Sequence, residues 1–196
     1  MNSKERTPVI EFKDFQFQYF SQAEPTLHDI NLTICKGEKV LLVGPSGSGK
    51  STLGHCLNGL IPFSYKGEIK GSLKIMGQET KEMDIFQLSK MVGTVLQDSD
   101  GQFIGLTVGE DVAFALENDC VGLEKMRETV QKVTDIVDMG ELLKSSPFEL
   151  SGGQKQRASF AGVMVDDVDI LLFDEPLANL DPATGKTAID LIDRVW

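Results

Sequence analysis

The most constraining feature of this sequence is a glycine-rich octapeptide, GPSGSGKS, at residues 44–51. It matches the pattern G-x-x-x-x-G-K-[ST], and it lies between an apolar run at 37–44 and a segment of helical character at 50–60. Glycines let successive backbone N–H groups point inward, because no Cβ atom blocks them. Lys50 supplies a cation, and the N-terminus of the following helix adds its positive end. The octapeptide predicts a phosphate-binding loop (P-loop); the alternative is a Gly/Ser-rich loop without a ligand.

The segments around this loop predict strands. Residues 9–19 alternate between apolar and polar side chains, as a half-buried strand does. Further strands are expected at 32–34 and 67–77, and a buried strand at 37–44 runs into the P-loop. Residues 104–150 instead space their apolar side chains as amphipathic helices do. The sequence therefore predicts an α/β chain with a separate helical part.

A second chemical signal is the segment DILLFDEP at 169–176. Its short apolar run is typical of a buried parallel strand, and it ends in two carboxylates. Asp174 is then expected in the Mg²⁺ shell, and Glu175 near the γ-phosphate, where it can orient or deprotonate the attacking water. The alternative is two acidic residues that only end a strand.

A third signal is LSGGQKQR at 150–157, where a serine and two glycines precede a predicted helix. Exposed N–H groups, a hydroxyl and a helix N-terminus form an anion site. One chain has one P-loop to fill, so this second anion site is expected to complete the nucleotide site of another copy. The alternative is a plain helix N-cap with a glycine-rich loop.

Composition excludes several other classes of protein. The 196 residues carry a net charge of −11 and no basic face, which argues against nucleic acid as a partner. No apolar run reaches the roughly 20 residues of a membrane span, and the N-terminus lacks the apolar stretch of a signal peptide. Cys35, Cys56 and Cys120 form no CxxC pair, so we expect reduced thiols of a cytosolic protein rather than zinc or disulfide chemistry.

These motifs together resemble the ATP-binding domain of ABC transporters. LSGGQ resembles the signature motif of that family, and it lies between the P-loop and the DE strand in the family's order. The resemblance implies that Tyr19 stacks on adenine and that Gln97 senses Mg²⁺ and the transmembrane subunit. Residues 178–181, ANLD, match the D-loop of the family, which implies that Asp181 lies near the opposite protomer.

The resemblance implies a RecA-like P-loop NTPase core with an antiparallel β subdomain and an inserted helical subdomain at about 104–160. Residues 1–196 are expected to form one nucleotide-binding domain. Its expected ATP contacts are Tyr19, Gly44, Pro45, Ser46, Gly47, Ser48, Gly49, Lys50, Ser51, Thr52, Ser151, Gly152, Gly153, Gln154 and Asp181. The expected Mg²⁺ ligands are Ser51, Gln97 and Asp174, and the expected catalytic residues are Glu175 and Gln97.

The implied function is ATP hydrolysis that powers solute import from the cytoplasmic face of the membrane. The implied partners are a second ATPase domain, head-to-tail, and integral membrane subunits. The segment 97–108 resembles ATPases of energy-coupling-factor transporters, and 161–182 resembles their subgroup linked to thiamine or its hydroxymethylpyrimidine precursor. The alternatives are a non-transport ABC ATPase of DNA repair or ribosome work, and an ATP-binding regulatory half without turnover.

Two further expectations follow from the resemblance. Residues 97–105 are expected to contact a transmembrane subunit through Phe103, or Phe103 packs against the helical subdomain instead. The family carries a switch histidine about thirty residues after the D-loop, whereas the only histidines here are His28 and His55. We therefore expect a truncated domain that binds ATP and hydrolyses it slowly or not at all.

Overall fold

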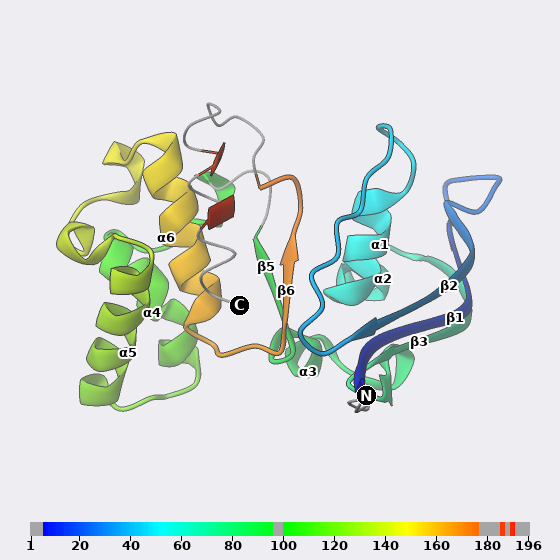
Figure 1. The fold of residues 1–196 in the computed structure, drawn as a ribbon, viewed down its shortest axis with the longest axis horizontal. Helices are drawn as coiled ribbons and strands as arrows, with labels where there is room; N and C mark the ends of the chain where they lie inside the picture. The colour runs from blue at the N-terminus through cyan, green and yellow to red at the C-terminus, as the bar shows by residue number, and fades with distance from the viewer. Residues whose placement is uncertain (1–5, 96–99, 177–184, 187–188, 191–196) are drawn as a thin grey trace, which may run out of the picture. The chain divides into compact units, whose positions relative to one another are not determined.

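The computed structural model describes residues 6–95, 100–176, 185–186 and 189–190. The chain divides into two compact units, Met1–Val92 and Gly93–Trp196. Figure 1 shows an antiparallel sheet with short helices in the first unit, and a group of longer helices in the second. None of the described helices combines the length and hydropathy of a membrane span.

The first unit is built on a sheet with the strand order β2-β1-β3-β4, in which neighbouring strands are antiparallel. The predicted strands at 9–19, 32–34 and 67–77 are all found in it, and the predicted helix at 50–60 is found as two short helices. The elements are β1 (Pro8–Tyr19), β2 (Leu27–Cys35), α1 (Lys50–Leu57), α2 (Leu60–Phe63), β3 (Gly67–Ile75), β4 (Gln78–Glu79), η1 (Thr80–Glu82) and α3 (Ile85–Ser89).

A bulge in β1 decides which of its side chains are buried. Ile10 and Phe12 are buried before the bulge and Phe15 and Phe17 after it, so burial passes from even to odd positions. At the bulge Asp14 adopts φ +46°, and its N–H donates to the Asn31 side chain at 2.9 Å. The extra residue keeps all four apolar side chains in the core. In a regular strand, side chains alternate strictly between the two faces, and positions 10 and 12 would face away from positions 15 and 17.

The prediction of a buried strand at 37–44 is wrong for this structure. The structure assigns no strand there, and Val40, Leu41, Leu42 and Val43 are each more than half exposed. An apolar run shows only that a segment is suited to burial. A central strand also needs a partner strand on each side, and these partners are set by contacts distant in sequence.

Over the described residues 93–95 and 100–176, the second unit contains three α-helices and a two-stranded sheet of β5 and β6. The helices predicted in 104–150 and the strand predicted in 169–176 are confirmed. The elements are β5 (Val92–Val95), η2 (Asp100–Gln102), α4 (Val108–Asn118), α5 (Leu123–Ile136), η3 (Gly140–Leu142), η4 (Pro147–Glu149), α6 (Gly152–Met164) and β6 (Ile170–Phe173). All four residues of β6 are half-buried, less than a central strand would be.

The helices α4, α5 and α6 pack on one another around a core of small and branched side chains (Figure 1). Val108 and Val112 of α4 are fully buried, and Val130 and Val133 of α5 face the same core. Phe103 is half-buried and packs against this cluster. Of the two roles expected for Phe103, the structure supports packing.

The cysteines are free thiols, as expected. Cys56 on α1 is 3% exposed, and burial raises the pKa of its thiol to about 12. The charged thiolate is disfavoured there because it would lose its hydration. Among the described residues, no group of three or more His, Cys, Asp or Glu side chains could hold a metal ion.

Candidate nucleotide-binding site

The P-loop leads directly into α1, as the sequence predicts. Gly47 and Gly49 adopt φ +80° and +90°, a left-handed conformation that strains residues with a Cβ atom. A Cβ on Gly49 would also come within 3.0 Å of Leu27 and 3.2 Å of the Thr26 carbonyl oxygen. These two glycines let the chain turn tightly into the N-terminus of α1. The loop residues that precede Gly49 are all exposed: Gly44, Pro45, Ser46, Gly47 and Ser48.

Lys50 folds back across the loop that precedes it. Its Nζ atom donates to the carbonyl oxygens of Gly44 and Pro45, at 3.0 Å each. Neutral carbonyl oxygens are weaker partners for an ammonium group than phosphate oxygens. Phosphate oxygens would therefore compete well with the Gly44 and Pro45 carbonyl oxygens for the hydrogen bonds of this ammonium group. Ser51 follows it on α1 and is exposed.

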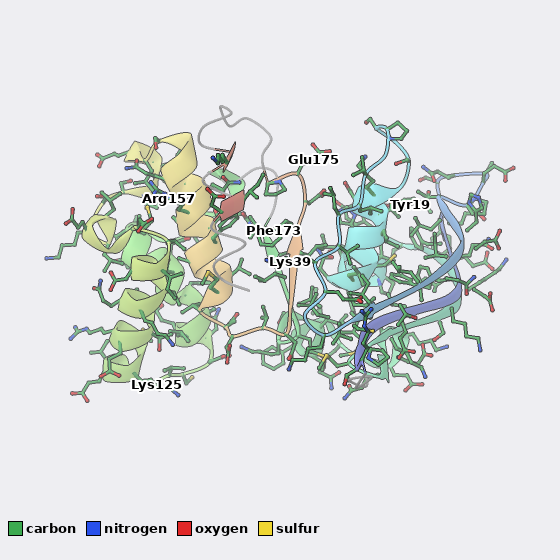
Figure 2. The ribbon with its side chains drawn as sticks, viewed as in Figure 1. Tyr19, Lys39, Lys125, Arg157, Phe173 and Glu175 are labelled. Carbon is green, nitrogen blue, oxygen red and sulfur yellow. The ribbon has the colours of Figure 1, made fainter. Side chains whose placement is uncertain are left out.

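Tyr19 lies beside the helix that the P-loop begins (Figure 2). Its hydroxyl is 3.3 Å from Oγ1 of Thr52, which is buried on α1. Its ring packs edge-on against Phe17, with the ring centroids 4.7 Å apart. The structure thus brings together two predicted site residues that are 33 positions apart, the aromatic of β1 and a threonine of the P-loop helix.

The two predicted acidic residues follow β6 in the second unit. The Asp174 N–H donates to the Val95 carbonyl oxygen at 3.0 Å, which continues the pairing of β6 with β5. Glu175 is exposed, and Figure 2 labels it at the end of β6. It adopts φ +50°, a left-handed conformation that costs a residue with a Cβ atom about 1–2 kcal/mol. Strain of this kind is concentrated at functional sites.

The signature segment forms a regular helix start. The Ser151 hydroxyl accepts a hydrogen bond from the Gln154 N–H at 3.4 Å, and the Gln154 side-chain oxygen accepts one from the Ser151 N–H at 2.9 Å. This capping box positions the exposed Gly152 at the N-terminus of α6, a helix of 13 residues. The first turn carries no acidic side chain that would oppose an anion. Gly153 and Gln154 are half-buried.

The predicted site residues are divided between the two units. The first unit holds Tyr19 and residues 44–52, and the second holds Asp174, Glu175 and residues 151–154. Gln97 and Asp181 lie outside the described residues. Tyr65 is not among the predicted site residues, yet the centroid of its ring lies 6.4 Å from that of Tyr19. Its place could have been found from the pairing of two neighbouring strands, which puts Gly67 opposite Tyr19.

The comparisons with known proteins agree with these motifs. The family model for ABC transporters matches residues 27–178. Two relatives that bear the name ABC transporter ATP-binding protein come from Clostridium perfringens and Photobacterium profundum. The first is 64% identical over 191 residues, 97% of this chain and 34% of the relative, and the second is 65% identical over 187 residues, 95% of this chain and 33% of the relative. The chain thus spans about a third of the length of these relatives.

A solved structure is also similar, cbiO1 from Clostridium perfringens, which is described as part of the ABC transporter complex cbiONQ. It is 28% identical, with a TM-score of 0.87 over 96% of this chain and 74% of that chain. This likeness identifies the α/β fold as that of a RecA-like P-loop NTPase. Family match, relatives and fold agree, and the chain belongs to the ABC transporter family.

Proposed function

We propose that this domain binds MgATP at the P-loop and hydrolyses it to power solute import. The observation that carries the proposal is the P-loop itself, in which Lys50 reaches the Gly44 and Pro45 carbonyl oxygens and Tyr19 adjoins the same helix. In this assignment residues 44–52 hold the phosphates and Tyr19 stacks on adenine. Ser151, Gly152, Gly153, Gln154 and Asp181 meet the nucleotide of the opposite domain.

Hydrolysis then needs a metal ion and a base. Ser51, Gln97 and Asp174 supply hard oxygen ligands of the kind Mg²⁺ prefers, and bound Mg²⁺ neutralises charge on the phosphates. Glu175 orients a water molecule and takes its proton as the water oxygen bonds to the γ-phosphorus and the bond to the bridging oxygen breaks. The exposure of Glu175 and its strained backbone are compatible with this role.

The domain is proposed to work as one half of a larger assembly. Residues 1–196 form one nucleotide-binding domain with its helical subdomain at about 104–160. It pairs head-to-tail with a second ATPase domain and binds integral membrane subunits at the cytoplasmic face. The likeness to a protein described as part of a transporter complex supports these partners. The solute is a vitamin or vitamin precursor, of the thiamine or hydroxymethylpyrimidine class, taken up by an energy-coupling-factor transporter.

Phosphate release by the purified chain tests the enzymatic part of this proposal. We expect slow release that saturates with ATP and stops when EDTA removes Mg²⁺, because the metal neutralises the phosphates. Single-turnover conditions, with the chain in excess over ATP, detect slow hydrolysis. Release that continues unchanged in EDTA would contradict the metal-dependent mechanism. Adding excess Mg²⁺ back should restore the rate and serves as the control.

A further inference from the structure

An aromatic cluster adjoins the P-loop helix in the first unit. The ring of Tyr65 meets that of Tyr19 edge-on, with centroids 6.4 Å apart and an interplanar angle of 85°. The same ring stacks on His55 of α1, at 4.9 Å and 19°. The ring of Tyr19 also packs edge-on against Phe17, with centroids 4.7 Å apart and an interplanar angle of 79°. Tyr65 therefore connects the aromatic residue at the end of β1 with the helix that begins at the P-loop.

The backbone of the sheet holds Tyr65 in this place. Tyr19 pairs with Gly67 across β1 and β3, and the Phe20 N–H donates to the Lys66 carbonyl oxygen at 3.4 Å. A Cβ atom on Gly67 would come within 2.3 Å of the Gln18 carbonyl oxygen, so the glycine allows the two strands to approach. Tyr65 lies two residues before Gly67, so the pairing of β1 with β3 places its ring close to that of Tyr19.

Exposure separates Tyr65 from the core aromatics. Phe15 and Phe17 are 2% and 0% exposed, whereas Tyr65 is 44% exposed. A ring that served only the core would be expected to bury more of its surface. Its described ring contacts are with Tyr19, the predicted adenine-stacking residue, and with His55, five residues after Lys50 on α1.

We infer that Tyr65 is a positioning residue for the nucleotide base, which it serves by fixing the ring of Tyr19. This inference rests on the proposed function, in which Tyr19 stacks on adenine. Edge-to-face packing from Phe17 and Tyr65, and the contact between the Tyr19 hydroxyl and Thr52, restrict rotation of the Tyr19 ring. A ring ordered before binding loses less conformational entropy when the base stacks on it.

The test compares a ligand that has a base with one that lacks it. ATP and tripolyphosphate are titrated calorimetrically into the 196-residue chain and its Tyr65→Ala variant. We expect ATP affinity to fall about three- to tenfold, the range that an aromatic pair contributes. Tripolyphosphate affinity should stay within about twofold, because its phosphates are not in contact with the altered ring.

Two further variants control for a structural effect. Tyr65→Phe keeps the ring and should restore ATP affinity. Phe86→Ala removes an aromatic of the same unit that is 64% exposed on α3, and should leave both affinities unchanged. Equal losses of ATP and tripolyphosphate affinity in Tyr65→Ala would overturn the inference, since they would indicate a general disturbance of the fold. Unchanged ATP affinity would overturn it as well.

A Tyr19→Ala variant separates this inference from the function on which it rests. Its preference for ATP over tripolyphosphate should fall at least as far as that of Tyr65→Ala. If only Tyr19→Ala loses the preference, the positioning role of Tyr65 is wrong and the base assignment stands. If Tyr19→Ala keeps the preference, the base assignment is wrong, and the role of Tyr65 is overturned with it.

Discussion

Replacing Lys50 by alanine should weaken ATP binding at least about 100-fold, because hydrogen bonds from the ammonium to charged phosphates are lost. The fold should persist, since the bonds of the Nζ atom within the described part of the chain are to the carbonyl oxygens of two exposed residues, Gly44 and Pro45. Calorimetric titration with ATP measures the affinity, and thermal unfolding without nucleotide measures the stability. We expect the free energy of unfolding to change by less than about 1 kcal/mol.

The matched control is Lys36→Ala, which removes the same charge from an exposed position of the same unit. It should leave ATP affinity within about twofold, since a distant surface charge is screened by salt. An equal loss of affinity in both variants would indicate a general electrostatic effect. Unchanged affinity in Lys50→Ala would contradict the assignment of the P-loop.

Replacing Glu175 by glutamine should slow phosphate release about 100- to 10,000-fold, the range that a general base contributes. The amide keeps the size and shape of the side chain, so ATP binding should be retained. Single-turnover phosphate release measures the first effect and calorimetry the second. ATP should then accumulate on the protein, and the head-to-tail pair should persist in size-exclusion chromatography with ATP.

Glu141→Gln is the control for this variant, because it removes the same charge from an exposed position in the second unit. Its rate of phosphate release should equal that of the unchanged chain. A Glu175→Gln variant that hydrolyses ATP at the unchanged rate would exclude Glu175 as the base. A variant that no longer binds ATP would indicate instead that Glu175 acts in binding.

Local patterns predicted much of the fold. The strand at 9–19 was evident from its alternation, and the helices α4 and α5 from the spacing of Val108, Val112, Val130 and Val133. The start of α6 was evident from the serine and two glycines that precede the helix, and the structure adds a capping box between Ser151 and Gln154. These features depend on neighbours within a few positions, which a sequence records directly.

Features that depend on distant partners were not predicted. The apolar character of 37–44 was recognised, but whether it forms a strand depends on pairing with segments far along the chain, and the structure leaves Leu41 86% exposed. The contact of Tyr19 with Thr52 joins positions on two elements, and the stacking of Tyr65 on His55 follows from the same arrangement. The bulge at Asp14 also depends on a contact distant in sequence, since the Asp14 N–H donates to the side chain of Asn31 on β2.

Calorimetric titration of the unchanged 196-residue chain with ATP in the presence of Mg²⁺ tests the central claim most directly. The claim is that this is an ATP-binding domain whose nucleotide site is built on residues 44–52. It predicts saturable binding of ATP, with one nucleotide per chain, and competition by tripolyphosphate for the same site. A chain that is folded by circular dichroism, yet shows no saturable ATP binding, would contradict it.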